Sequence, residues 1–168
     1  LQRLMSEWKT RGEEQSYDTL IPQAAEATIA SIIPVDDALF MNPVNMENAL
    51  MDYCRQHDLP VPQNKAEMVK CVLQSLAFKY KQAVEKLNRC LPSPIRQLNI
   101  IGGGSQNKLL NQLTADTLGI PVYAGPVEAT AIGNILTQAM AKGEISDLHE
   151  LREIVRHSVT PQVYHPKK

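Results

Sequence analysis

The feature that most constrains this chain is a run of three glycines directly after a short apolar segment, Leu-Asn-Ile-Ile at residues 98–101. Gly102, Gly103 and Gly104 remove every side chain where this predicted strand ends, which lets a ligand approach the backbone and permits positive φ. A helix is predicted over residues 106–118, and the free N–H groups at its start suit a phosphate or a polar ring edge. The glycine turn is therefore a candidate ligand site; a tight turn packed against its neighbour is the alternative.

A second strand and a second helix follow. Residues 120–124 (Ile-Pro-Val-Tyr-Ala) read as a strand, and a helix is expected from Gly125 to about Lys142. The order strand, helix, strand, helix predicts two parallel strands joined by a crossover helix. Because two strands are too few for a free-standing sheet, we expect partner strands from chain upstream of residue 1. Parallel sheets bind ligands at the carboxyl ends of their strands.

The start of this second helix has an unusual composition, Gly-Pro-Val-Glu-Ala-Thr-Ala-Ile-Gly-Asn at residues 125–134. Ala129, Ala131 and Gly133 keep the helix thin, so it is expected to pack close to a sheet or a ligand. Glu128 is expected in its first turn, where a carboxylate suits the helix dipole. Close helix packing with an N-terminal acid is the reading that requires no ligand.

Residues 1–95 are predicted to be mainly helical. The expected helices are an opening helix with Leu1, Leu4, Met5 and Trp8 at helical spacing, a helix over residues 17–31, a helix capped by Asn45, and a long helix from the cap pair Asn64 and Glu67 to about Cys90. Pro22 is tolerated in the second of these only within the first turn. Residues 146–168 are expected to hold one last helix, capped by Asp147 and Glu150, and a tail.

Charge, hydropathy and cysteine usage exclude several classes of function. The formal net charge is −1, so no basic field would gather a nucleic acid. No stretch approaches the ~20 apolar residues of a membrane helix. The cysteines, Cys54, Cys71 and Cys90, lack metal-site spacing, and their odd number without an export signal indicates reduced thiols in the cytoplasm. We predict no metal site within the chain.

The glycine turn does not fit two familiar nucleotide motifs. A P-loop needs Gly-Lys followed by Ser or Thr, but three residues separate Lys108 from Gly104 and neither hydroxyl residue follows. A dinucleotide-binding turn needs a third glycine where Asn107 stands. The glycines are positioned to bind a nucleotide, but the motif belongs to a different family of nucleotide-binding proteins.

Four segments in order resemble the C-terminal half of the FGGY carbohydrate kinases. They are the glycine turn, residues 109–116 (Leu-Leu-Asn-Gln-Leu-Thr-Ala-Asp), residues 119–122 (Gly-Ile-Pro-Val) and residues 125–134. Within that family the resemblance is closer still to the kinases of rhamnulose, through residues 37–43 (Asp-Ala-Leu-Phe-Met-Asn-Pro) and Cys-Arg-Gln from Cys54. It covers nearly the whole chain.

The resemblance implies an α/β fold, the C-terminal lobe of an actin-like ATPase (ribonuclease H-like) fold, incomplete in this chain and with a large helical layer. Residues 1–168 would form the nucleotide-binding lobe of a two-lobed cytoplasmic kinase that uses ATP, with Mg²⁺ brought by the nucleotide, to phosphorylate L-rhamnulose. A kinase of xylulose or fuculose is an alternative. So is a non-catalytic nucleotide-binding module of the same fold.

The resemblance also implies which residues meet the nucleotide. Gly103, flanked by Gly102 and Gly104, would pass under the adenosine and the α-phosphate, Asn107 would reach the adenine edge, and Gln2 would be a further contact. The family's catalytic aspartate and sugar site lie upstream of Gln2. No catalytic residue is therefore expected in this chain, whose partners would be ATP, the N-terminal lobe of the same protein and, through that lobe, the sugar. Rhamnulose kinases can carry cysteines at the positions of Cys54 and Cys71, which could approach each other, although a reducing cytoplasm disfavours a disulfide.

Overall fold

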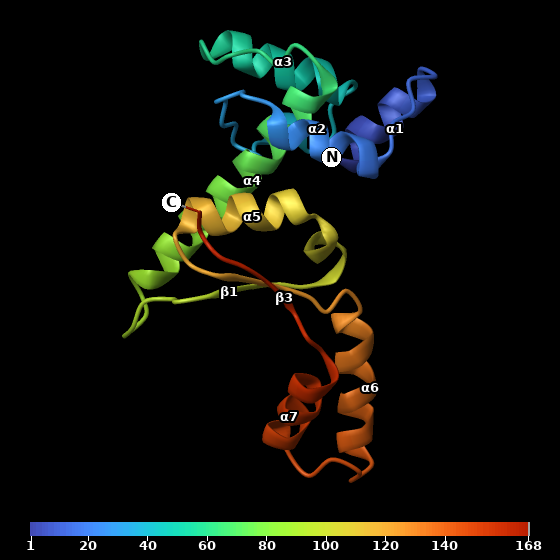
Figure 1. The fold of residues 1–168 in the computed structure, drawn as a ribbon, viewed down its shortest axis with the longest axis vertical. Helices are drawn as coiled ribbons and strands as arrows, with labels where there is room; N and C mark the ends of the chain where they lie inside the picture. Colours follow the sequence, from blue (N-terminus) through green and yellow to red (C-terminus); the bar gives the residue numbers. More distant parts are fainter. Residues whose placement is uncertain (168) are drawn as a thin grey trace. The chain divides into compact units, whose positions relative to one another are not determined.

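The computed structural model describes residues 1–167 and divides into two compact units (Figure 1). Unit 1 is Leu1–Pro92 and unit 2 is Ser93–Lys168, of which all but the last residue is described. None of the helices in the described residues combines the length and the apolar character needed to cross a bilayer. Each unit is described by itself.

Unit 1 is helical, as predicted. Its elements are α1 (Gln2–Thr10), α2 (Tyr17–Glu26), the short 3-10 helix η1 (Ala38–Phe40), α3 (Met46–Gln56) and α4 (Lys65–Asn88). The predicted caps are confirmed, since Asn45 Oδ1 accepts from Asn48 N at 2.7 Å and Asn64 Oδ1 accepts from Glu67 N at 2.9 Å. The apolar side chains that these helices bury are Leu4, Trp8, Leu20, Ala24, Leu50, Met68, Val69, Leu73 and Ala77.

The predicted helix over residues 17–31 is wrong in its second half, because α2 ends at Glu26. Pro22 lies inside the helix as its sixth residue, beyond the first turn. The chain then leaves the helix, and Ile29, Ser31 and Ile33 are buried in alternation. Side chains of α4 satisfy this segment's backbone: the Gln74 amide donates to Ser31 O at 2.7 Å, and Ser75 Oγ accepts from Ile33 N at 2.9 Å.

Cys54 and Cys71 are buried free thiols, and the structure contains no disulfide between them. Cys71 Sγ donates to Ser31 O at 3.4 Å. Burial, followed by the nearby Cys54, raises the pKa of the Cys71 thiol to about 12. The thiol therefore stays protonated at neutral pH, as expected for a small buried hydrophobe.

A carboxylate on α1 caps the start of α3. Glu7 Oε1 accepts from Met46 N at 2.9 Å, and Arg3 Nε donates to the same carboxylate at 3.1 Å. Burial works to raise the pKa of Glu7, but the hydrogen bonds from Met46 N and Arg3 outweigh it and hold this pKa below its ordinary value. The ionised form is thus the one that the fold stabilises.

Replacing Glu7 by glutamine is expected to lower the free energy of unfolding by about 1 kcal/mol at neutral pH, because a neutral acceptor binds these donors less strongly than a carboxylate. Since the folded pKa is depressed, the charged contribution is present above the unfolded pKa and is lost as pH falls through the folded pKa. Urea unfolding of Glu7→Gln and wild type should therefore converge in acid. Glu14→Gln, at an exposed ion pair with Lys9, is the control. A difference that stays constant with pH would contradict the assignment.

Unit 2 contains a small sheet covered by one helix. The strands are β1 (Leu98–Ile100), β2 (Val122–Ala124) and β3 (Gln162–Tyr164), in the order β1-β2-β3. β1 and β2 are parallel, and α5 (Lys108–Leu118) connects them, which confirms the predicted parallel pair and crossover helix. Ala115 of α5 packs with Val122, Ala124 and Tyr164 in the core of this unit. Gly119, at φ +70°, ends α5 in the left-handed region as predicted.

The third strand was not predicted, because residues 146–168 were expected to be a helix and a tail. β3 pairs antiparallel with β2, with Tyr164 opposite Val122. Its three residues are too few to show a periodicity. The chain itself therefore supplies a third strand to the sheet. From the sequence, we had expected the partner strands to come from chain upstream of residue 1.

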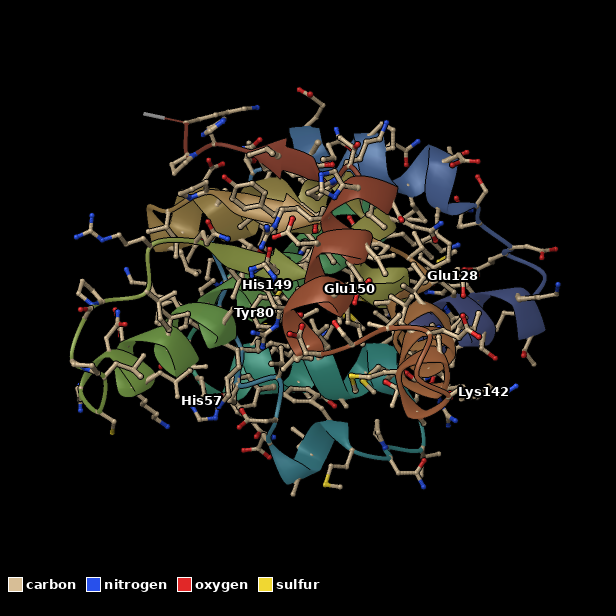
Figure 2. All side chains as sticks on the ribbon, turned by 90° about the horizontal axis from the view of Figure 1, so that it is seen from below. His57, Tyr80, Glu128, Lys142, His149 and Glu150 are labelled. Carbon is tan, nitrogen blue, oxygen red and sulfur yellow. The ribbon has the colours of Figure 1, made fainter. Side chains whose placement is uncertain are left out.

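The last two helices, α6 (Ala129–Ala141) and α7 (Leu148–Ser158), contact each other. The predicted cap of α7 is confirmed, because Asp147 Oδ1 accepts from His149 N and Glu150 N, both in the first turn (Figure 2). Close packing of α6 on the sheet is wrong, since no residue of α6 is buried. Glu128 is also not in the first turn; it is the N-cap residue, and its side chain makes no cap hydrogen bond.

Candidate functional site at the glycine turn

The glycine turn after β1 forms the short 3-10 helix η2 (Gly102–Gln106). Gly102 has φ +73°, a conformation that L side chains rarely adopt. Gly103 and Gly104 are exposed, and apart from the turn's own backbone no heavy atom of residues 1–167 lies within 4 Å of the place where a Cβ of Gly103 would be. Packing against a neighbour thus does not explain Gly103, and the backbone there is open to an approaching ligand.

The turns that follow the two parallel strands are joined by hydrogen bonds. Gly125 N donates to Ile100 O at 2.8 Å, and Gly102 N donates to Pro126 O at 3.0 Å. These two bonds therefore hold together the loops that follow β1 and β2 at the carboxyl edge of the sheet. This is the edge at which α/β sheets bind ligands.

Two side chains that the sequence pattern did not reveal support the turn from inside. Ser105 Oγ donates to Gly102 O at 2.6 Å, and Asn111 Nδ2 donates to Ser105 O at 2.8 Å. Asn111 is fully buried and Ser105 is 9% exposed. The signal available in the sequence was an asparagine on the same helix face as Ala115, where an apolar residue would be expected.

Asn107 is the N-cap residue of α5. Its Oδ1 accepts from Leu110 N at 3.0 Å, and its backbone N–H donates to Gly104 O at 3.1 Å. The cap uses one of the two acceptor positions of the amide oxygen. The amide is half-buried, and none of its hydrogen bonds with the described residues uses the Nδ2 donor.

The five residues that the resemblance implied fall into two places. Gly102, Gly103, Gly104 and Asn107 lie together at the glycine turn of unit 2. Gln2 is the first residue of α1 in unit 1 and is exposed. Among residues 1–167, no group of three or more His, Cys, Asp or Glu side chains is arranged to hold a metal ion.

Similar proteins point to one family. Residues 1–142 match the C-terminal domain of the FGGY family of carbohydrate kinases. A rhamnulokinase of Bacteroides thetaiotaomicron is 46% identical over 155 residues, which are 92% of this chain and 32% of that protein. Those of Pectobacterium atrosepticum and Bacillus subtilis are 44% and 41% identical, over 99% and 92% of this chain and 35% and 32% of their own lengths. The chain thus spans about a third of these relatives.

A solved structure is similar in fold. The ligand-bound xylulose kinase from Lactobacillus acidophilus superposes with a TM-score of 0.59 over 98% of this chain and 33% of that one, at 17% sequence identity. At this identity the likeness shows the fold alone, and it confirms the expected actin-like ATPase architecture. The chain belongs to the FGGY family of carbohydrate kinases.

Proposed function

We propose that this chain is the nucleotide-binding part of a cytoplasmic, ATP-dependent L-rhamnulose kinase, which transfers the γ-phosphate of ATP to the sugar to give L-rhamnulose 1-phosphate. The observation that carries the nucleotide role is the exposed glycine turn at the carboxyl edge of the sheet, with open space at Gly103. The choice of sugar rests on the similarity to rhamnulokinases of several bacteria.

In this proposal the turn passes under the adenosine and the α-phosphate. A side chain at Gly103 would occupy the space that the ligand takes, whereas Gly102 gives the turn its positive φ. Asn107 donates from Nδ2 to an acceptor of the adenine edge, and Gln2 makes a further contact with the nucleotide. Mg²⁺ arrives with ATP and is held by the phosphates and by the rest of the kinase.

The sugar site and the catalytic base belong, in this proposal, to the part of the kinase that the relatives contain and this chain does not span. Two aspartates of this chain, Asp36 and Asp116, are engaged in structural contacts instead. Asp36 pairs with Lys79, and Asp116 Oδ1 accepts from Lys167 N at 2.7 Å. The N-terminal lobe of the same kinase is therefore the essential partner of this chain.

The role of Asn107 is tested with a variant that keeps the oxygen acceptor capping α5 but removes the amide donor proposed to bind the base. In the full-length kinase, Asn107→Ser keeps an acceptor for the α5 cap but lacks the amide. We expect the KM for ATP to rise about fivefold to tenfold, because one hydrogen bond to the base is lost, while the KM for L-rhamnulose and the melting temperature stay near wild type. Asn107→Ala should show the same rise in KM and, in addition, a loss of stability of about 1 kcal/mol.

Steady-state kinetics with both substrates check this result. An unchanged KM for ATP in Asn107→Ser, with a lowered melting temperature in Asn107→Ala, would make Asn107 a helix cap and nothing more. Faster phosphorylation of xylulose or fuculose than of L-rhamnulose by the wild-type kinase would contradict the proposed sugar.

A further inference from the structure

Asn111 is unusual among the buried residues of unit 2. Its side chain is fully buried on α5 and donates to Ser105 O, but its Oδ1 is buried without a hydrogen-bond partner anywhere in the described chain. A buried acceptor left without a donor is unfavourable. An apolar side chain of the same branching would avoid the penalty on Oδ1, but it would leave Ser105 O without the donor that Asn111 supplies.

The hydrogen bond that Asn111 does make leads to the glycine turn. Asn111 Nδ2 holds the carbonyl of Ser105 near the end of η2, and Ser105 Oγ holds the carbonyl of Gly102 at its start. Gly103 and Gly104 lie between these two fixed carbonyls. Without side chains of their own, they can be held only through their backbone groups, as Gly104 O is by Asn107 N.

The remaining backbone bonds of the turn do not replace this support. Gly102 N binds Pro126 O and Asn107 N binds Gly104 O, so both bonds are made between backbone groups of exposed or half-buried loops. The bond from Asn111 is the one in which a buried side chain ties the turn to helix α5, and the bond from Ser105 Oγ to Gly102 O closes the turn on itself. Three glycines in a row would otherwise make this segment mobile.

We propose that Asn111 and Ser105 are positioning residues for the nucleotide: they fix the glycine turn before ATP arrives, so that binding does not have to order it. The inference rests on the proposed nucleotide role of the turn and deepens it. Preorganisation of this kind raises affinity without adding a contact to the ligand. Loss of either side chain should therefore weaken the binding of ATP and ADP while the sugar site is left unchanged.

The test uses Asn111→Leu in the full-length kinase, with Thr114→Val as the matched control. Thr114 is equally buried on α5, but its Oγ1 donates to Leu110 O within the helix and not to the turn. For Asn111→Leu we expect the Kd for ADP and the KM for ATP to rise about tenfold, with an unchanged KM for L-rhamnulose and cooperative thermal unfolding that shows the variant to be folded at the assay temperature. Amide hydrogen exchange over residues 102–106 should become faster in this variant. Thr114→Val should change none of these values.

Three results would overturn the inference: an unchanged Kd for ADP in folded Asn111→Leu, an equal loss for ADP and sugar, or the same loss in Thr114→Val. If Asn111→Leu fails to fold, Ser105→Ala replaces it as the test variant, because it removes only the hydrogen bond to Gly102 O. An unchanged Kd for ADP in Ser105→Ala would refute the positioning role. Wild-type kinase that binds no ADP would refute the proposed function, whereas wild type that binds ADP no better than the variants refutes the positioning role.

Discussion

The purified chain of residues 1–168 is expected to release no ADP from ATP in response to L-rhamnulose. Phosphoryl transfer depends on holding the acceptor hydroxyl, the base and the phosphates in line, and we place the base and the sugar site outside this chain. Loss of that positioning should lower turnover by at least about 10⁵-fold relative to the full-length kinase. A coupled assay for ADP measures this directly.

The control for this experiment is the full-length kinase under the same conditions, which should turn over with L-rhamnulose. Sugar-dependent ADP release by the pure chain above a no-enzyme blank would mean that residues 1–168 contain a catalytic base. The engaged carboxylates Asp36 and Asp116 would then become candidates for that base.

Gly103→Val is expected to lower kcat/KM for ATP in the full-length kinase by about 100-fold, because displacing a bound substrate by about 1 Å can have an effect of this size. The fold should tolerate the change. Gly103 does not have a positive φ, and apart from the turn's own backbone its Cβ would meet no heavy atom of the described chain within 4 Å. Within the described chain the new side chain would displace no other group, so we expect it to disturb a bound ligand.

Ala83→Val, at an exposed position of α4 outside the candidate site, is the control for the added methyl groups. Its kcat/KM for ATP should stay near wild type. For Gly103→Val, the KM for L-rhamnulose should be unchanged. An equal loss for both substrates in a folded variant would show that Gly103 does not line the nucleotide site.

The sequence predicted the parts of the fold that local chemistry determines. Asn45 and Asn64 cap helices where their side chains suggested, and Gly119 ends α5 in a left-handed conformation. The three glycines marked the turn between β1 and α5 correctly. Each of these features depends on residues within a few positions of one another, so a single sequence contains the necessary information.

Features that depend on distant residues were missed. The sequence pattern extended α2 to residue 31, but Ser31 O accepts a hydrogen bond from Gln74 and Ile33 N donates one to Ser75, more than 40 residues away. β3 exists because Tyr164 completes the core beside Val122. No local pattern reports such tertiary contacts.

The sequence predicted the glycine turn of the candidate site and Asn107, but it did not predict the side chains that hold the turn in place. The glycines and Asn107 stood out because their residue types are unusual at the end of a strand. That Asn107 Oδ1 caps α5, and that Asn111 and Ser105 hold the turn, follows from side-chain directions that a linear pattern does not contain. In the proposed site Asn107 therefore acts as a donor, and Asn111 and Ser105 join it as the proposed positioning residues.

Calorimetric titration of the isolated chain with ADP, and separately with L-rhamnulose, tests the central claim most directly. We predict saturable binding of ADP, weaker than in the full-length kinase because part of the phosphate site is missing, and no binding of the sugar. Saturable binding of L-rhamnulose by a folded chain that does not bind ADP would contradict this claim, because residues 1–168 would then carry the sugar site and not the nucleotide site.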